Sequence, residues 1–99
     1  MTERKQVYKI TYPNGKIYIG MDLYGNCTYF GHLSKTAQEN VNRDLADCRM
    51  DFTVRKEIMW ESETASLAEV RAKEIEAIMA NQSNNPAIGY NLSPRFRSS

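Results

Sequence analysis

The chain has 99 residues and a net charge of +1, with 41% hydrophobic and 25% charged residues. This composition is typical of a globular domain in water, and the length predicts a single domain, 1–99, with one modest core. No apolar run reaches the ~18 residues that a membrane-spanning helix needs, and the N-terminus lacks the apolar stretch of a signal peptide. We therefore expect a cytoplasmic protein with no membrane partner.

Neither the cysteines nor the charges indicate a ligand. Cys27 and Cys48 do not have the spacing of a zinc site, and in a reducing compartment both are expected to be free thiols. Basic residues cluster near both chain ends and at 55–56, and acidic residues concentrate between 57 and 76. A solvated surface of mixed charge explains this distribution as well as a nucleic-acid partner does.

The N-terminal part of the chain predicts a β-hairpin. Two runs rich in β-branched and aromatic residues flank a turn sequence, namely 7–12, 16–21 and Pro13-Asn14-Gly15. A three-residue loop would pair Ile10 with Tyr18 and Tyr8 with Gly20. Tyr8 and Tyr18 would then be diagonal neighbours on one face of the sheet, about 7–8 Å apart. A two-residue loop would place the two tyrosines on opposite faces.

A helix and a third strand are predicted to follow. Thr36 and Glu39 form a capping box that would begin the helix. Its buried stripe consists of small and aliphatic residues at helical spacing: Ala37, Val41, Leu45 and Cys48. The third strand is expected at 52–60, where residue parity puts one set of side chains on each face: Phe52, Val54 and Ile58 against Thr53, Arg55 and Glu57.

A second capping box, from Ser66 to Glu69, predicts the last helix at 67–80. Its apolar face contains four aliphatic residues: Leu67, Val70, Ile75 and Ile78. The element order β-β-α-β-α predicts a small α+β domain with a mainly antiparallel three-stranded sheet flanked by helices.

Glu74 is an anomaly in this last helix, because it falls inside the apolar face between Val70 and Ile78. An ionised carboxylate on a buried face is costly unless a cation, a metal ion or hydrogen bonds compensate it. Arg71, three residues earlier on the same side, could form an ion pair with Glu74. A structural ion pair and a functional carboxylate are both consistent with the pattern.

The tyrosines of the hairpin are open to the same two interpretations. Tyrosines on paired strands usually pack against one another. However, Gly20 beside Tyr8 and Tyr18 leaves a gap where a ligand or metal could approach the backbone. Lys9 and Lys16 would favour an ionised tyrosine, whereas desolvation would oppose it.

Four segments of the chain, in the same order, resemble the motifs of the GIY-YIG nuclease superfamily. They are Val7-Tyr8 with Asn14-Gly15-Lys16-Ile17-Tyr18-Ile19-Gly20, then 52–61 as the third strand, then Glu74 with Ile78, and finally Gly89-Tyr90-Asn91. The resemblance covers 7–92 and leaves 93–99 as a short basic tail. Gln6 stands where the family has a glycine.

The resemblance implies an activity as well as a fold. Glu74 would hold one divalent cation, Mg²⁺ or Mn²⁺, against the scissile phosphate of DNA. Tyr8 and Tyr18 would position and deprotonate the attacking water, and an arginine would stabilise the charge that builds on the phosphate. Oxygen-only ligation suits Mg²⁺, and cations provide the electrostatic stabilisation that phosphodiester hydrolysis requires.

The resemblance leaves the arginine undetermined. Thr28 stands where the family has its helix arginine, and His32 stands where a histidine often follows. We favour Arg55 for the role because a long cation in mid-strand needs a reason to be there. Arg43, on the predicted solvent face of its helix, is the second candidate, and loss of the role is the third possibility.

The remaining candidates are expected to contact substrate. Lys16 and Arg43 are assigned to this role as cations. His32 either contacts phosphate or transfers a proton, or it is an ordinary loop residue. Asn91 is assigned to substrate as well, although hydrogen bonding that secures the chain end is the stronger alternative.

These observations predict a metal-dependent endonuclease that hydrolyses DNA phosphodiester bonds. The alternatives are a non-catalytic nucleic-acid-binding module on the same fold, and a structural interaction domain in which Arg71 and Glu74 complete the core. At this length we expect no room for an appended specificity module. Specificity would therefore be low or would come from a homodimer or a partner protein.

Overall fold

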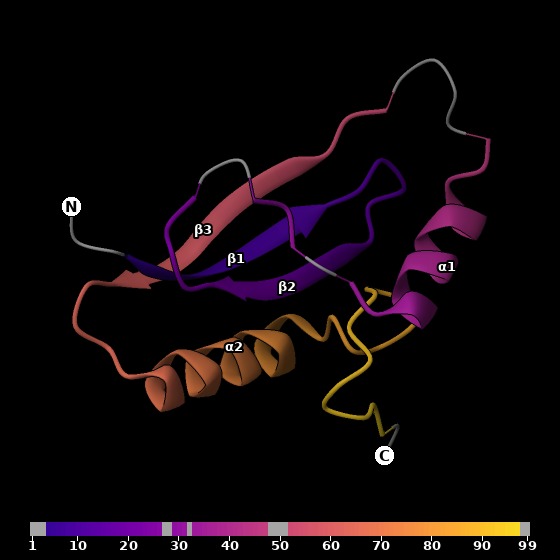
Figure 1. The fold of residues 1–99 in the computed structure, drawn as a ribbon. Helices are drawn as coiled ribbons and strands as arrows, with labels where there is room; N and C mark the ends of the chain where they lie inside the picture. Colours follow the sequence, from indigo (N-terminus) through magenta and orange to yellow (C-terminus); the bar gives the residue numbers. More distant parts are fainter. Residues whose placement is uncertain (1–3, 27–28, 32, 48–51, 98–99) are drawn as a thin grey trace.

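The computed structural model describes residues 4–26, 29–31, 33–47 and 52–97. Within them the chain forms three strands and two helices, in the order β1 (Lys5–Thr11), β2 (Ile17–Asp22), α1 (Lys35–Asp44), β3 (Arg55–Ser62) and α2 (Leu67–Asn81) (Figure 1). The strands form one antiparallel sheet in the order β2-β1-β3. The predicted α+β class with a three-stranded antiparallel sheet is confirmed. No helix among the described residues has the length and apolar character needed to cross a membrane.

The hairpin has the predicted register. The amide of Tyr12 donates to the carbonyl of Lys16 at 2.9 Å, and Gly15 closes the three-residue loop with a φ of 85° that favours glycine. Ile10 therefore lies opposite Tyr18, and Tyr8 lies opposite Gly20. Both tyrosines project from the same face of the sheet, as the three-residue loop predicts.

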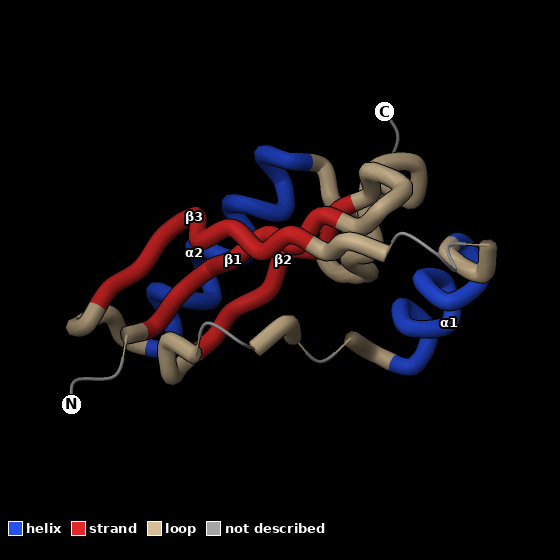
Figure 2. Tube along the Cα trace, turned by 90° about the horizontal axis from the view of Figure 1, so that it is seen from above, coloured by secondary structure: helices blue, strands red, loops and turns tan. Residues whose placement is uncertain are grey.

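The sheet carries an apolar cluster on each face; α2 lies along the strands, whereas α1 lies beyond their ends, near the hairpin turn (Figure 2). On one side, α2 buries an apolar cluster made of Val7, Ile19, Ala65, Val70 and Ile78. On the other side, α1 and the segment before it cover a cluster made of Tyr8, Ile10, Tyr12, Val41, Leu45 and Tyr90. The alternation of β1 thus divides its side chains between two small cores, and Tyr8 belongs to the core on the α1 side.

Helix α1 begins earlier than predicted. Ser34, and not Thr36, is the N-cap, and its hydroxyl accepts a hydrogen bond from the amide of Ala37 at 3.2 Å. Both residue types are good caps, so the local sequence does not decide between them. Leu33 packs against the core beside Tyr8, which fixes where the chain turns into the helix. The predicted burial of Ala37, Val41 and Leu45 is confirmed, whereas Cys48 lies outside the described residues.

Strand β3 begins and ends later than predicted because its limits are set by its partner strand. Thr11, the last residue of β1, lies opposite Arg55, so the pairing of β3 with β1 begins at Arg55. The pairing also shifts along the strand: Tyr8 lies opposite Ile58, but Val7 lies opposite Trp60. The extra residue in this β-bulge reverses the side-chain alternation, and Trp60 therefore packs into the core under α2.

Helix α2 confirms the second capping box in part. Ser66 is the N-cap and accepts from the amide of Glu69 at 3.2 Å. The helix ends at Asn81, where Gln82 adopts a left-handed conformation with a φ of 55°. The predicted apolar face is too wide, because Leu67 and Ile75 are 48% and 43% exposed. A sheet of three short strands covers only the centre of the stripe, which contains the fully buried Val70 and Ile78.

Candidate functional site

A cleft of about 370 Å³ lies at the outer edge of β2. Its walls come from three parts of the chain: α2, the beginning of α1, and the segment that follows α2. The polar and charged side chains that line it include those of Tyr18, Ser34, Arg71, Glu74, Tyr90 and Asn91. Glu74 and Tyr18, which were predicted from distant parts of the sequence, therefore share one cleft.

Glu74 is half-buried on α2, between the buried side chains of Val70 and Ile78. Burial raises the pKa of its carboxyl group above the usual value, and the positive charge of Arg71 offsets part of that increase. Arg71 lies close enough to act on Glu74, but the ion pairs found among the described residues do not join them. The carboxylate is thus partly desolvated and faces a cleft without a directly bonded cation.

Tyr18 is the hairpin tyrosine that lines the cleft. It is partly buried on β2, and its pKa is raised above the ordinary phenol value by burial and then by the negative charge of Glu74. The direction of this shift means that Tyr18 is a neutral phenol at pH 7. It can donate a hydrogen bond in that state, but it can act as a base only after it loses its proton.

Tyr8 lies beneath the surface and does not line the cleft. Only 1% of it is exposed, and burial is the main cause that raises its pKa far above the usual value. A Cβ atom at Gly20 would lie 2.5 Å from the Tyr8 hydroxyl oxygen and 3.2 Å from Cε2 of Tyr18, and one at Gly31 would also meet both side chains. The two glycines therefore form the space in which the tyrosines lie side by side.

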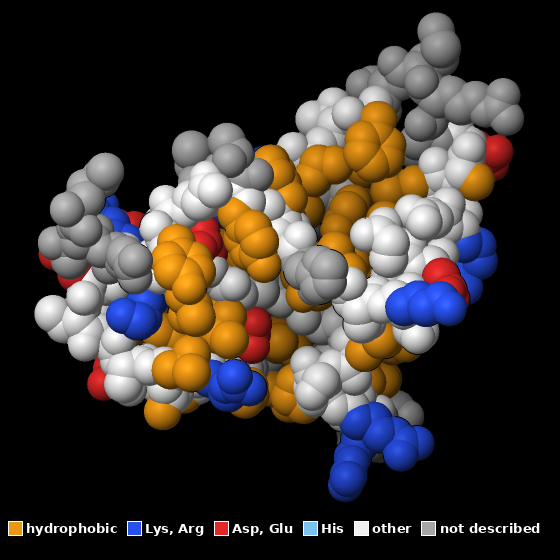
Figure 3. Space-filling view, viewed as in Figure 1, with side chains coloured by type: hydrophobic (Ala, Val, Ile, Leu, Met, Phe, Trp, Pro, Cys, Tyr) orange, Lys and Arg blue, Asp and Glu red, His pale blue; other side chains and the backbone are white. Residues whose placement is uncertain are grey.

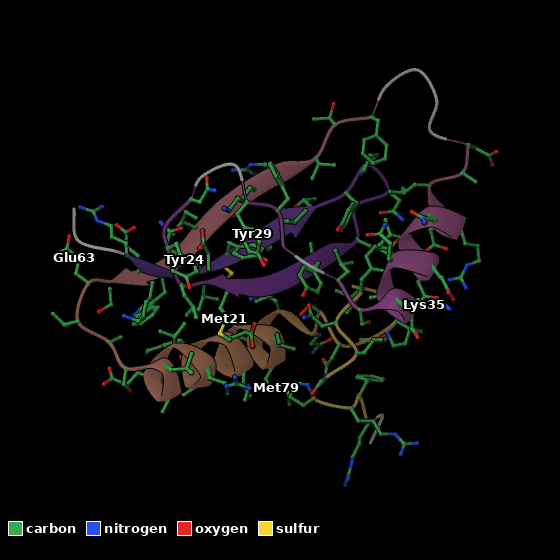
Figure 4. All side chains as sticks on the ribbon, in the orientation of Figure 1. Met21, Tyr24, Tyr29, Lys35, Glu63 and Met79 are labelled. Carbon is green, nitrogen blue, oxygen red and sulfur yellow. The ribbon has the colours of Figure 1, made fainter. Side chains whose placement is uncertain are left out.

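Lys56 and Asp22 make hydrogen bonds that hold the segment after β2 over Tyr8, and these bonds were not predicted from the sequence. The ammonium group of Lys56 donates to the carbonyls of Asn26 at 3.0 Å and Tyr29 at 2.6 Å, and it lies 4.9 Å from the centre of the Tyr8 ring. The buried carboxylate of Asp22 accepts from the amides of Tyr24 and Asn26 at 2.9 and 2.7 Å, respectively. Figure 4 shows Tyr29 and Tyr24 on the side of the sheet away from α2, whereas Met21 points toward that helix.

The lysines proposed to favour an ionised tyrosine have other partners. Lys9 pairs with Glu57 at 3.4 Å, and Lys16 pairs with Asp44 at 3.2 Å. Lys56 is the lysine beside Tyr8. It could have been recognised only from the register of β3, in which it lies opposite Ile10 on the Tyr8 face.

Asn91 fastens the segment after α2 to β2. Its side-chain oxygen accepts from the amide of Ile19 at 2.8 Å, and its side-chain nitrogen donates to the carbonyl of Ile19 at 2.7 Å. Gly89 forms a parallel bridge with Ile17 just before it. Asn91 lines the cleft, but both ends of its amide are bonded to β2. The geometry supports its role in securing the chain end.

Comparison with known proteins adds no relative. No family model, curated protein or solved structure matches the chain. The functional argument therefore rests on the residues and their arrangement.

The candidate arginines lie at different places in the structure. Arg55 is exposed at the start of β3, on the strand farthest from β2, and does not line the cleft. The Arg43 side chain is 70% exposed, as predicted, and pairs with Asp44 at 3.1 Å in a neighbouring cleft. Arg71 is the arginine that lines the same cleft as Glu74 and Tyr18. In the sequence, the spacing between Arg71 and Glu74 predicted an ion pair and no other role for Arg71.

One other candidate, His32, assigned to substrate contact or proton transfer, lies outside the described residues. So does Thr28, which stands at the position of the family's helix arginine. Lys16 is described, but it lies with Arg43 in the neighbouring cleft and not beside Glu74.

The cleft fits one type of metal site better than others. In the described part of the chain, no group of three or more His, Cys, Asp or Glu side chains gathers to enclose an ion. Mg²⁺ commonly binds through one or two carboxylates, with water and substrate phosphate completing its octahedral shell. Glu74, as one partly desolvated carboxylate in an open cleft, fits such a site and does not fit a zinc site.

Proposed function

We propose that this protein is a divalent-metal-dependent nuclease that hydrolyses phosphodiester bonds of DNA in the cleft beside Glu74. The observation that carries the proposal is the presence of a half-buried carboxylate, a phenol and a guanidinium in one cleft: Glu74, Tyr18 and Arg71. These groups can hold a cation, orient a water molecule and bind a phosphate. The resemblance of the hairpin and of the Glu74 helix to the GIY-YIG superfamily supports the same activity, which we place in the cytoplasm.

In this proposal Glu74 holds a single Mg²⁺ or Mn²⁺, which supplies Lewis-acid stabilisation of the phosphate when bound. The planar guanidinium of Arg71 donates to two non-bridging phosphate oxygens and stabilises the charge that develops on them. Arg71 takes the role expected of Arg55 because a group acting on the transition state must reach the cleft that holds the carboxylate.

Tyr18 positions the attacking water and, as the phenolate that forms once its own proton has been lost to solvent, accepts a proton from that water. The pKa of Tyr18 is raised partly by the charge of Glu74. A cation held by Glu74 would cancel that charge and shift the phenol back toward ionisation. Tyr8 acts indirectly, because its buried ring supports Tyr18 and fills the space between Gly20 and Gly31.

A non-catalytic DNA-binding module is the second candidate. The observation that favours it is the direction of both pKa shifts, since two neutral tyrosines are weaker bases than a nuclease needs at neutral pH. Such a module would bind DNA in a salt-sensitive manner and leave it intact.

Nicking of supercoiled plasmid DNA separates the two functions. The wild-type protein should convert plasmid to the open-circular form with Mg²⁺ or Mn²⁺ and not with EDTA. Glu74→Gln preserves the size of the side chain but removes its charge, so it should abolish nicking while the circular dichroism spectrum stays unchanged. Binding without nicking in either metal would favour the second candidate, and nicking by Glu74→Gln at the wild-type rate would contradict the role of the carboxylate.

A further inference from the structure

A second cleft, of about 280 Å³, adjoins the first along the segment that follows α2. Three cations and one carboxylate line it: Lys16, Arg43, Arg95 and Asp44. Three positive charges and one negative charge leave a local net charge of +2, in a chain whose total is only +1. In Figure 3, several of the Lys and Arg side chains on the visible face lie at this end of the molecule, where α1 and the C-terminal segment meet.

Asp44 contacts two of these cations, Lys16 and Arg43, and its single negative charge leaves the local net charge at +2. Its carboxylate accepts from the hydroxyl of Tyr90 at 2.8 Å, and it pairs with Lys16 at 3.2 Å and with Arg43 at 3.1 Å. Arg43 uses its Nε for this contact and one terminal nitrogen for Asn40, while its side chain stays 70% exposed. The guanidinium is therefore oriented by its neighbours and still accessible from solvent.

The two clefts share part of their lining. Tyr90, Asn91 and Leu92 line both of them, so the clefts adjoin along this short segment. Helix α1 forms a common wall, with Ala37 at the cleft of Glu74 and Arg43 at the second cleft. Six helical residues correspond to about 9 Å along the helix axis. The phosphates of one DNA strand follow one another about every 3.4 Å along the duplex axis and lie farther apart along the backbone itself, so this distance corresponds to about one or two phosphate steps.

We infer that the two clefts form a single track for the phosphate backbone of DNA, in which Arg43 and Arg95 bind phosphates adjacent to the one held near Glu74. The inference rests on the proposed function for the position of the reacting phosphate. The contribution of Arg43 and Arg95 to binding does not depend on catalysis. If these residues formed only a surface ion-pair network, the contacts would be the same. Removing Arg43 or Arg95 would then affect DNA binding no more than removing another exposed cation of the chain.

Fluorescence anisotropy of a labelled DNA duplex tests the track. Binding is measured in EDTA across a range of salt concentrations, so that cleavage plays no part. Arg43→Ala and Arg95→Ala should each weaken binding about threefold or more at moderate salt, and each should flatten the salt dependence by about one charge. Lys73→Ala is the charge-matched control, because Lys73 pairs with Glu76 on α2 and lines neither cleft.

A substitution that removes a negative charge from the second cleft should have the opposite effect on DNA binding. Asp44→Asn keeps an oxygen that can accept from Tyr90 but raises the local charge from +2 to +3, so it should tighten DNA binding. A purely structural network predicts a loss of thermal stability without tighter binding.

The outcomes separate this inference from the proposed function. Wild-type affinity in both arginine variants, or an equal loss in Lys73→Ala, would overturn the track even if the protein nicks DNA. Weaker binding in both arginine variants, in a protein that never nicks DNA, would support the track and overturn only the proposed catalysis.

Discussion

The partly buried carboxyl group of Glu74 should make the stability of the protein depend on pH, which can be measured without any assay of activity. Because burial raises the pKa of its carboxyl group in the folded state, the folded protein holds this proton more tightly than the unfolded chain does. The stabilisation from protonated Glu74 is present below the unfolded-state pKa and is lost as pH rises through the raised folded-state pKa. Glu74→Gln should remove this loss, so its melting temperature should exceed that of the wild type at neutral pH. A lower melting temperature at neutral pH would indicate a structural ion pair with Arg71.

The two tyrosines of the hairpin should behave differently when their hydroxyls are removed. Tyr18 lines the cleft, so Tyr18→Phe should lower the cleavage rate by roughly 10²–10⁴-fold, the scale of a lost general base. Tyr8 is covered, and Tyr8→Phe should have a clearly smaller effect on rate. Wild-type activity should increase as pH rises above neutral, because ionisation of Tyr18 is suppressed by burial and by Glu74. Plasmid nicking measured against pH checks both statements, and equal, near-normal rates in the two variants would exclude tyrosine chemistry.

Arg71 and Arg55 can be compared directly, because each is an exposed arginine on a regular element. Arg71→Lys keeps the charge but loses the planar pair of donors, so cleavage should decrease by ~10²-fold or more while DNA binding changes little. Arg55→Lys should leave both properties close to wild type. Rates and affinities measured separately for the two variants decide the matter. A loss of cleavage confined to Arg55→Lys would return the role to the strand residue favoured from the sequence.

At the level of elements, the site depends on how the segment after α2 is attached to β2. Asn91→Leu is close in volume but removes both hydrogen bonds to Ile19, leaving a buried amide and carbonyl without these partners. Each such group costs about 1–3 kcal/mol, so the variant should lose about 2–6 kcal/mol of unfolding free energy. Asn42→Ala, at an exposed position on α1, should change it by less than about 0.5 kcal/mol. Urea unfolding measures both, and similar values for the two variants would contradict this account of the attachment.

The elements also differ in how far the sequence predicts them. The turn at Asn14-Gly15 determines its own register, and Ser66 caps α2 through a local hydrogen bond, so both features could be predicted. The limits of β3 could not, because they depend on where β1 ends and on a bulge opposite Val7 and Tyr8. The start of α1 was missed for a similar reason, since two adequate caps compete and packing of Leu33 chooses between them.

At the level of the whole molecule, the cleft forms only where distant parts of the chain pack together. Glu74 and Tyr18 could be proposed from their patterns, but the walls of the cleft come from α1 and from α2 with the segment after it, and α1 is far from the other two in the sequence. A helical wheel shows the side of α2 to which Arg71 belongs, but it does not show what faces that side. The sequence therefore favoured Arg55, which does not line the cleft, over Arg71, which does, whereas the place of Glu74 on the apolar face of α2 could be predicted without the structure.

The central claim is that Glu74 holds a divalent cation in this cleft. Crystals of the wild-type protein soaked in Mn²⁺ and measured near the manganese absorption edge test it most directly, because the anomalous signal identifies the metal independently of activity. We expect one peak within bonding distance of the Glu74 carboxylate, on the side facing Tyr18 and Arg71, and no such peak in crystals of Glu74→Gln. Manganese bound elsewhere, with none beside Glu74 in the wild type, would contradict the account.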